Sequence, residues 1–373
     1  MMRVLLSFMT VSLAIGVGLL SGCGSSGNPP AAVASTPADV YVAGVVYTPQ
    51  GGGATYWKNG NPVSLSGFSL GSSANAIAVS GNDVYVAGVG SNGGQDIAAY
   101  WKNGALVTLT AGTGRGFANA IFVSNGDVYV AGAESSASGN SQVAKYWKNG
   151  VPVSLAQTAS DGMANAIFVS GTDVYVAGYV SQTSQTALNS TFTTQVATLW
   201  KNGSAVSLTD GLHTSEALSL FVSGSDVYVA GYSAHTVQGS DNTATYWKNS
   251  SPITLKDATD SFADSIVVSG QDVFVAGGDD AKTAGYWKNG VQTILPGGTV
   301  ANQIAVSGSD VYLAGNNFPS SPIGPSGTSG TADGASGGGI GATYWKNATP
   351  LSLAPDAYGS TASAIAVNSA NPN

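Results

Sequence analysis

One short motif recurs seven times along the chain and strongly limits the folds available to it. The motif is Asp-Val-Tyr-Val-Ala-Gly, with one residue changed in two of the copies, and successive copies begin 38 to 53 residues apart. The copies begin at Asp39, Asp83, Asp127, Asp173, Asp226, Asp272 and Asp310. A period of about 40–50 residues is typical of proteins in which each unit buries its apolar surface against the next unit.

Two further motifs divide each unit into four predicted strands. The motif Tyr-Trp-Lys-Asn-Gly contains all seven tryptophans of the chain, at positions 57, 101, 147, 200, 247, 287 and 345. Asn-Gly favours a two-residue hairpin turn. In the second unit, the strands are expected at 77–79, 84–89, 99–101 and 106–109. Four strands per unit are typical of a propeller blade.

The two ends of the repeat region predict a closed ring. The first unit begins directly with its second strand at Asp39, whereas segment 361–367 is a first strand without a following unit. The second and third strands are nearly continuous apolar runs, which indicates sheets that are buried on both faces. We therefore predict an all-β fold. It is a seven-bladed β-propeller with four-stranded antiparallel blades, closed by pairing of the C-terminal strand with the N-terminal blade.

Residues 39–367 resemble the bacterial seven-bladed-propeller repeat family and, more distantly, NHL-type propeller repeats. The resemblance is carried by Ile77-Ala78-Val79, a glycine-containing turn, and Val84-Tyr85-Val86-Ala87-Gly88. It implies the fold and no particular activity, because propellers support many unrelated functions. The Tyr-Trp-Lys-Asn-Gly motif departs from the NHL pattern, so NHL partners are not carried over.

The N-terminal segment resembles a bacterial lipoprotein signal. One positive charge at Arg3 precedes the apolar run 4–20, which leads into Leu20-Ser21-Gly22-Cys23 and then a Gly/Ser/Pro-rich stretch. The resemblance implies cleavage before Cys23 and attachment of lipid there; an uncleaved transmembrane anchor is the alternative. We expect a signal peptide over 1–22, a flexible tether over 23–38 and the propeller over 39–373. The expected location is the bacterial cell envelope, at the outer membrane or cell surface rather than the inner membrane.

Composition excludes several partners and chemistries. Only 9% of the residues are charged and the net charge is −8, so no basic surface for nucleic acid is expected. The single cysteine excludes an internal disulfide. No nucleophile elbow, arginine clamp or glycine-rich phosphate loop is found, and we expect neither catalytic residues nor a cofactor. We also expect a monomer.

The connections between strands predict two different faces. The turns between first and second strands and between third and fourth strands are short and uniform, and they share one rim, here called the lower face. The other connections share the upper face. There, 8 to 28 residues separate the glycine of the first motif from the tyrosine of the second motif in the same unit (Leu199 in the fourth unit), the longest stretch being 316–343. Variable loops on a rigid scaffold commonly carry function, so we expect binding at the upper face.

Two groups of side chains are candidate binding residues. The first group lies on upper-face connections and comprises His213, Glu216, His235 and Asp241, near Asp210. It suits a metal site, an acid–base pair or solvated loop residues, and because its spacing matches no zinc motif we predict no metal. The second group precedes the predicted first strands and comprises Asn75, Asn119, Asn165, Asp264 and Asn302, with Ser363 and the exception Leu218. This group either surrounds the channel mouth and binds a ligand or caps local turns.

The repeated Trp, Tyr and Lys residues have both structural and functional interpretations. The aromatic residues are expected to pack between blades, with carbohydrate stacking as the alternative. Pairing of the second and third strands would bring Asp83 near Lys102, giving an ion pair or a docking surface. The hypothesis for the whole chain is a membrane-anchored, non-catalytic scaffold that binds a protein or glycan through its upper face. A glycan hydrolase or lyase at the channel mouth and a structural envelope protein are the alternatives.

Overall fold

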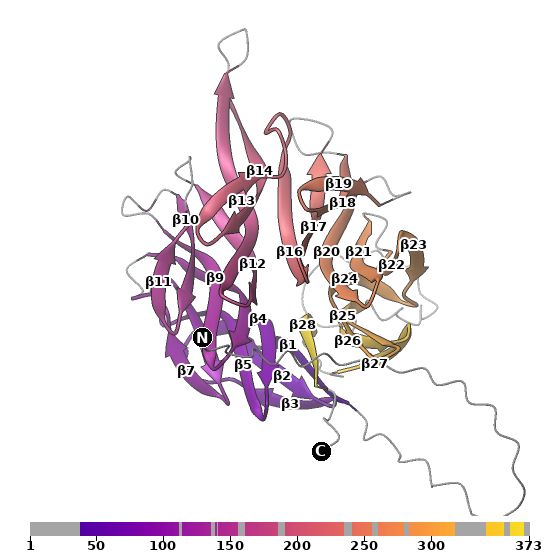
Figure 1. Ribbon diagram of the computed structural model, residues 1–373. Helices are drawn as coiled ribbons and strands as arrows, with labels where there is room; N and C mark the ends of the chain where they lie inside the picture. The colour runs from indigo at the N-terminus through magenta and orange to yellow at the C-terminus, as the bar shows by residue number, and fades with distance from the viewer. Residues whose placement is uncertain are drawn as a thin grey trace, which may run out of the picture. The chain divides into compact units, whose positions relative to one another are not determined.

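The computed structural model describes the propeller from residue 38 onward. The described residues are 38–111, 114–135, 139, 141–155, 161–185, 191–234, 241–255, 260–279, 283–317, 341–353 and 359–368. They form seven four-stranded antiparallel sheets and contain no helix. The sheets are arranged as blades around a central channel (Figure 1). The predicted fold class is confirmed.

Each blade runs from an innermost strand at the channel to an outermost strand. Blade 1 contains β28 (Ser360–Asn368), β1 (Asp39–Thr48), β2 (Gly51–Lys58) and β3 (Asn61–Ser64). Blade 2 contains β4 (Gly71–Ser80), β5 (Asp83–Ser91), β6 (Asp96–Lys102) and β7 (Ala105–Thr108). Blade 3 contains β8 (Gly116–Ser124), β9 (Asp127–Ser135), β10 (Gln142–Lys148) and β11 (Val151–Ser154). Blade 4 contains β12 (Gly162–Ser170), β13 (Asp173–Gln185), β14 (Thr191–Lys201) and β15 (Ser204–Ser207).

The remaining three blades follow the same strand order. Blade 5 contains β16 (Ser215–Ser223), β17 (Asp226–Ala234), β18 (Asn242–Lys248) and β19 (Ser251–Thr254). Blade 6 contains β20 (Ser261–Ser269), β21 (Asp272–Asp279), β22 (Gly285–Lys288) and β23 (Val291–Ile294). Blade 7 contains β24 (Gly298–Ser307), β25 (Asp310–Asn317), β26 (Gly341–Lys346) and β27 (Thr349–Ser352).

The C-terminal strand closes the ring as predicted. Strand β28 is the innermost strand of blade 1 and pairs antiparallel with β1, with Val42 opposite Ile365 and Asp39 opposite Asn368. This pairing covers the edge of β1 that would otherwise expose unpaired backbone groups. The first blade is therefore built from the two ends of the repeat region.

The strands are longer than their apolar runs indicate. Strand β4 spans Gly71–Ser80, so the polar residue expected before the first strand lies inside it. In blade 4 the long connection between the second and third strands is largely a hairpin, paired as far as Gln185 opposite Thr191. This hairpin projects from the upper face (Figure 1). A polar sequence can remain in strand because backbone pairing continues beyond the apolar core.

Each innermost strand contains a β-bulge at the same place. In β4 the pairing with β5 passes from Ala74 directly to Ala76, which leaves Asn75 as the extra residue. The motif glycine opposite the bulge, Gly88, is required for steric reasons. A Cβ atom at this position would lie 1.9 Å from the carbonyl oxygen of Ser73. The glycine that ends each copy of the first motif thus permits the backbone to approach closely at the bulge.

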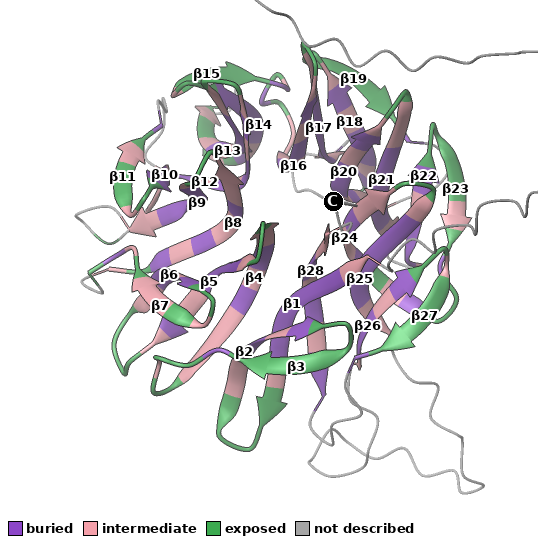
Figure 2. Cartoon of the chain, turned by 60° about the horizontal axis from the view of Figure 1, so that its bottom comes forward, coloured by how far each residue is buried: buried purple, intermediate pink, exposed green. Residues whose placement is uncertain are grey.

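The tryptophans pack between blades, as predicted. Trp101 of blade 2 is fully buried in a cluster with Tyr41 and Leu65 of blade 1, and its Nε1 donates to the carbonyl of Ser66 at 2.8 Å. Figure 2 shows the same pattern around the ring, with buried second strands and mostly exposed outermost strands. Inter-blade packing therefore accounts for a residue that recurs in every unit.

The lower face is built from seven nearly identical ion-paired turns. Each repeat Lys pairs with the repeat Asp of its own blade at 2.7–2.9 Å, and the lysines also lie 5.2–5.4 Å from the centre of an aromatic ring. In blade 2, Asn103 adopts a positive φ, accepts from the Val84 N–H and donates to Asp83. Hydrogen bonds from Asn103 and Lys102 lower the pKa of Asp83. The predicted cross-strand ion pair is confirmed.

Candidate functional site

The innermost strands enclose a central cavity of about 400 Å³. Its wall comes from β4, β8, β12, β16, β20, β24 and β28, the last of which contributes Ser363. The predicted ring residues Asn75, Asn119, Asn165, Asp264 and Asn302 all line this cavity. They lie at the bulges, within the strands, and not at turns before them.

Four of the asparagines join neighbouring blades. The Nδ2 of Asn75 donates to the carbonyl of Ala118 on the next blade at 3.0 Å. The same bond to the next blade recurs from Asn119 to Ala164 at 3.1 Å, from Asn165 to Ala217 at 3.0 Å and from Asn302 to Ala362 at 2.7 Å. The bulge projects each side chain across the blade boundary. The asparagines therefore form a belt of inter-blade hydrogen bonds, which neither turn capping nor ligand binding alone predicted.

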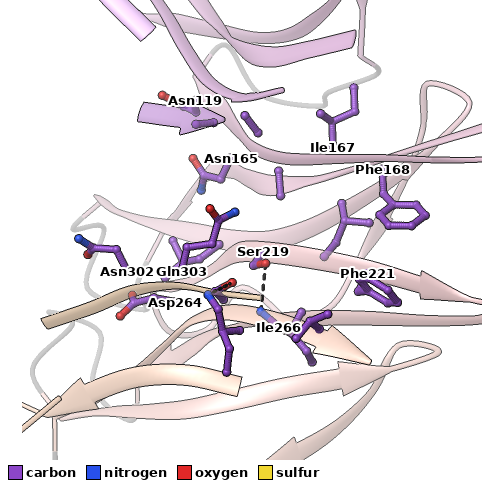
Figure 3. A pocket seen from close by; sticks show the side chains of 18 of the residues that line it. Asn119, Asn165, Ile167, Phe168, Ser219, Phe221, Asp264, Ile266, Asn302 and Gln303 are labelled. Carbon is purple, nitrogen blue, oxygen red and sulfur yellow. Dashed lines mark hydrogen bonds between the residues drawn. The ribbon is translucent and has the colours of Figure 1, made fainter. Parts of the chain in front are cut away.

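Polar residues one position further along the strands add a second set of inter-blade contacts. Ser219 Oγ accepts from the backbone N–H of Ile266 at 3.2 Å, a bond drawn in Figure 3. Ser265 accepts similarly from Ile304 at 3.3 Å. These serines lie beside 218 and 264, two of the three bulge positions that lack asparagine, the third being Ser363. They supply a polar contact between blades where the belt lacks an amide.

Asp264 stands in the belt where an amide donor would be expected. An ionised carboxylate cannot donate to a carbonyl as asparagine does. Burial raises the pKa of Asp264 to about 7. Among the residues lining the cavity, Asp264 is the one side chain that titrates near neutral pH, and no Lys, Arg or His lines it.

One side of the cavity is aromatic. Phe122, Phe168 and Phe221 come from three consecutive blades, and their ring centroids lie 4.7 Å apart for the first pair and 5.1 Å for the second. Figure 3 shows Asn119, Asn165, Asn302, Gln303 and Asp264 gathered on one side of the cavity, with Phe168 and Phe221 on the other. The cavity thus has a polar part and an apolar part.

A second polar cluster joins blades 4 and 5 above the belt. The Glu216 carboxylate on β16 is hydrogen-bonded by Tyr232 on β17 and by Gln195 on β14. Burial raises the pKa of Glu216, and the same carboxylate helps to raise the pKa of Tyr179 and Tyr232. The Phe262 ring of blade 6 packs edge-on against Tyr232 at 5.2 Å. We call Glu216, Gln195, Tyr179 and Tyr232 the mouth cluster.

The long hairpin of blade 4 supports the neighbouring connection. The Thr194 hydroxyl donates to the carbonyl of Gly211 at 2.8 Å, and a Cβ at Gly211 would approach Gln182 Oε1 to 2.6 Å. The hairpin thereby packs against the segment that carries His213. This segment leads directly into β16 and the mouth cluster.

The described members of the first predicted group do not all line one pocket. His213 and Asp210 line a separate pocket of about 350 Å³ with residues of blade 5, whereas Glu216 does not line it. Asp241 is exposed, with a positive φ, just before β18. His235 lies outside the described residues, as do Cys23, the tether and most of segment 316–343. Binding through these residues remains a prediction.

Several site residues were not predicted from the sequence. Tyr179, Tyr232 and Gln195 lie within or beside repeat strands, and no motif marks them. The available signal is that Tyr179 and Tyr232 follow the motif glycine, where blades 1 to 3 have Val45, Val89 and Ala133. Blades 6 and 7 have Gly278 and Asn316 at this position, so an aromatic residue occurs there only in blades 4 and 5.

The described part of the chain holds neither a cluster of metal ligands nor a membrane-spanning helix. No group of three or more His, Cys, Asp or Glu side chains lies close enough there to hold a metal ion. In the same part of the chain, no helix is long and apolar enough to span a bilayer.

Comparison with known proteins finds only distant structural similarity. No protein-family model and no curated protein matches the chain. The β-propeller domain of the Trilobed protease from Pyrococcus furiosus, described as having an open velcro topology, is similar at 8% identity and a TM-score of 0.47, over 87% of this chain and 97% of that one. An acylaminoacyl peptidase from Pyrococcus horikoshii is similar at 10% identity and a TM-score of 0.49, over 85% of this chain and 51% of that one. YjhT is similar at 13% identity and a TM-score of 0.41, over 75% of this chain and 97% of that one. These values carry no argument about activity.

Proposed function

We propose that this chain is a lipid-anchored, non-catalytic propeller that binds a glycan at its upper face, between blades 4 and 5. The mouth cluster is the observation that carries the proposal. It combines two half-buried tyrosines with the Glu216 carboxylate and the Gln195 amide. A sugar offers an apolar C–H face to an aromatic ring and hydroxyl groups to carboxylate and amide oxygens, so this set of side chains suits it.

The rest of the scaffold supports an upper-face site. On the lower face, the repeat lysines and aspartates are paired with one another within each blade. Their charge is therefore already compensated. The non-repeat contacts, including the mouth cluster, the His213 pocket and the projecting hairpin, lie on the connections and strand ends of the other side.

The direction in which the chain enters the propeller fits a tether. Strand β1 starts at Asp39, the residue that pairs with Lys58 in the lower-face turn. The described part of the chain therefore begins at the lower face. In this proposal, lipid on Cys23 anchors the chain to a membrane through the tether over 23–38.

A glycan array followed by titration calorimetry tests this proposal. The chain carries Cys23→Ser, so that it cannot receive lipid. The informative variant is Tyr232→Phe, which removes the hydroxyl that donates to Glu216. The matched control is Tyr85→Phe, which removes a lower-face hydroxyl lying 3.3 Å from Asp83. We expect a glycan that binds the parent and the control but binds Tyr232→Phe at least tenfold more weakly. Equal binding by both variants, or no glycan binding at all, would contradict the proposal.

Glycan cleavage at the same place is the second candidate function. The observation that favours it is the raised pKa of the Glu216 carboxyl, because a general acid must keep its proton near neutral pH. Release of reducing ends from any glycan that binds, abolished by Glu216→Gln, would establish cleavage. Binding without turnover would support the non-catalytic proposal.

A further inference from the structure

The central cavity is distinct from the mouth cluster and has its own chemistry. None of Glu216, Gln195, Tyr179 or Tyr232 is among the residues that line it. At about 400 Å³, it lies in the range of small-molecule sites and is far larger than a bare ion needs. The kind of ligand that fits this cavity is therefore inferred from the asparagine belt, Asp264 and the phenylalanines that line it.

Three belt asparagines that line the cavity have amide oxygens available to accept hydrogen bonds. The amide nitrogens of Asn119, Asn165 and Asn302 are committed to carbonyls of the next blade. Their amide oxygens make no hydrogen bond among the described residues. Gln303 differs, because its Oε1 already accepts from the Ile365 N–H at 2.6 Å. The belt asparagines can therefore accept hydrogen bonds from a ligand through their amide oxygens.

Asp264 adds a charge that nothing in the cavity compensates. No Lys, Arg or His lines the cavity, and no hydrogen bond to the Asp264 carboxylate is present in the described residues. An uncompensated buried carboxylate is costly, whereas asparagine, present at four equivalent positions, would continue the belt. A cationic ligand would therefore compensate the charge of the Asp264 carboxylate.

The aromatic side defines the rest of the ligand. Phe122, Phe168 and Phe221 form a continuous apolar surface, through ring contacts at 4.7 and 5.1 Å. Such a surface does not stabilise a hydrated inorganic ion, but it stabilises an alkyl or aryl group by removing it from water. The faces of the rings also attract an ammonium group.

We propose that the central cavity binds a small organic ammonium compound. Its charged head lies at Asp264 among the belt oxygens, and its apolar body lies against the three phenylalanines. The polar and apolar sides seen in Figure 3 correspond to these two parts of the ligand. This site is independent of glycan binding, because it shares no residue with the mouth cluster.

Calorimetric titration of the intact chain with hexylammonium tests the proposal, with hexanol as the uncharged probe of equal length. The decisive variant is Asp264→Asn, which keeps the side-chain shape and restores the amide used by the other blades. Asp96→Asn is the matched control, because it removes one negative charge at a site outside the cavity, where Asp96 pairs with Arg115. Phe168→Leu tests the apolar side.

We expect hexylammonium to bind the parent and Asp96→Asn equally and to bind Asp264→Asn at least tenfold more weakly. The parent should also bind hexylammonium at least tenfold more tightly than hexanol. Phe168→Leu should weaken hexylammonium more than methylammonium. Affinity should rise between pH 6 and 8 as Asp264 ionises, since the neighbouring strands β16 and β24 place no other titratable group in the lining. Equal binding of hexanol, equal binding by Asp264→Asn, or displacement of the probe by calcium chloride would overturn the proposal. Loss of glycan binding would not affect it.

Discussion

Replacing Asp264 by asparagine is expected to stabilise the protein in a pH-dependent way. Burial raises the pKa of Asp264 from 3.8 to about 7 in the folded chain. Each pKa unit corresponds to about 1.4 kcal/mol, so the ionised carboxylate costs the folded state up to about 4 kcal/mol. Because the folded pKa lies above the unfolded one, this cost is absent below about pH 4, grows between about pH 4 and 7, and is complete above about pH 7.

Urea unfolding of the parent and Asp264→Asn at pH 4, 6 and 8 measures the effect. The free energies of unfolding should agree closely at pH 4, where Asp264 is protonated in the folded chain. At pH 8 the variant should be more stable by about 4 kcal/mol. Comparison at equal pH cancels the titration of the other groups, and Asp96→Asn controls for net charge. A difference that stays constant within about 0.5 kcal/mol from pH 4 to 8 would refute the reasoning.

Two further predictions concern the scaffold, and both are measured by thermal and urea unfolding. Gly88→Ala should prevent stable folding or cost more than about 3 kcal/mol, since its Cβ would meet the Ser73 carbonyl oxygen at 1.9 Å. Gly81→Ala, in an open turn with φ of 59°, should cost only about 1 kcal/mol, and equal effects of the two changes would argue against the close approach at the bulge. Trp101→Phe should cost about 2–4 kcal/mol, because it opens space between blades 1 and 2 and leaves the Ser66 carbonyl without its donor. A loss below about 0.5 kcal/mol would show that inter-blade packing does not depend on the indole.

The sequence predicted the architecture because the same local pattern appears seven times and its two incomplete ends match. Turn residues such as Asn103-Gly104, apolar strands and the orphan segment at 361–367 all indicate the same arrangement. Agreement between local pattern and global fold is what makes such a prediction possible. The strand ends were less predictable, because pairing in β13 and β14 continues through polar residues.

The candidate site was predicted only in part, because its contacts connect different blades. The sequence showed that a polar residue occupies the position of Asn75 in every unit except the one with Leu218. The partner of the Asn75 amide, the Ala118 carbonyl, is 43 residues away and is set by how blades stack. Glu216 was grouped with His213 because the two are close in sequence. Instead, Glu216 belongs to a strand and is hydrogen-bonded by Gln195 of the preceding blade, whereas His213 lines another pocket. Spacing along the chain does not specify such neighbours.

Closure through β28 also limits when folding of the first blade can be completed. Strand β1 is synthesised before the rest of the repeat region, yet its partner β28 is separated from it by almost the whole of that region, with Asp39 opposite Asn368. Pairing between such distant segments is slow, because a long loop must close first. A chain that lacks β28 would keep that edge open and ready to join another polypeptide. Strand β28 thus determines whether this edge is available for pairing between molecules.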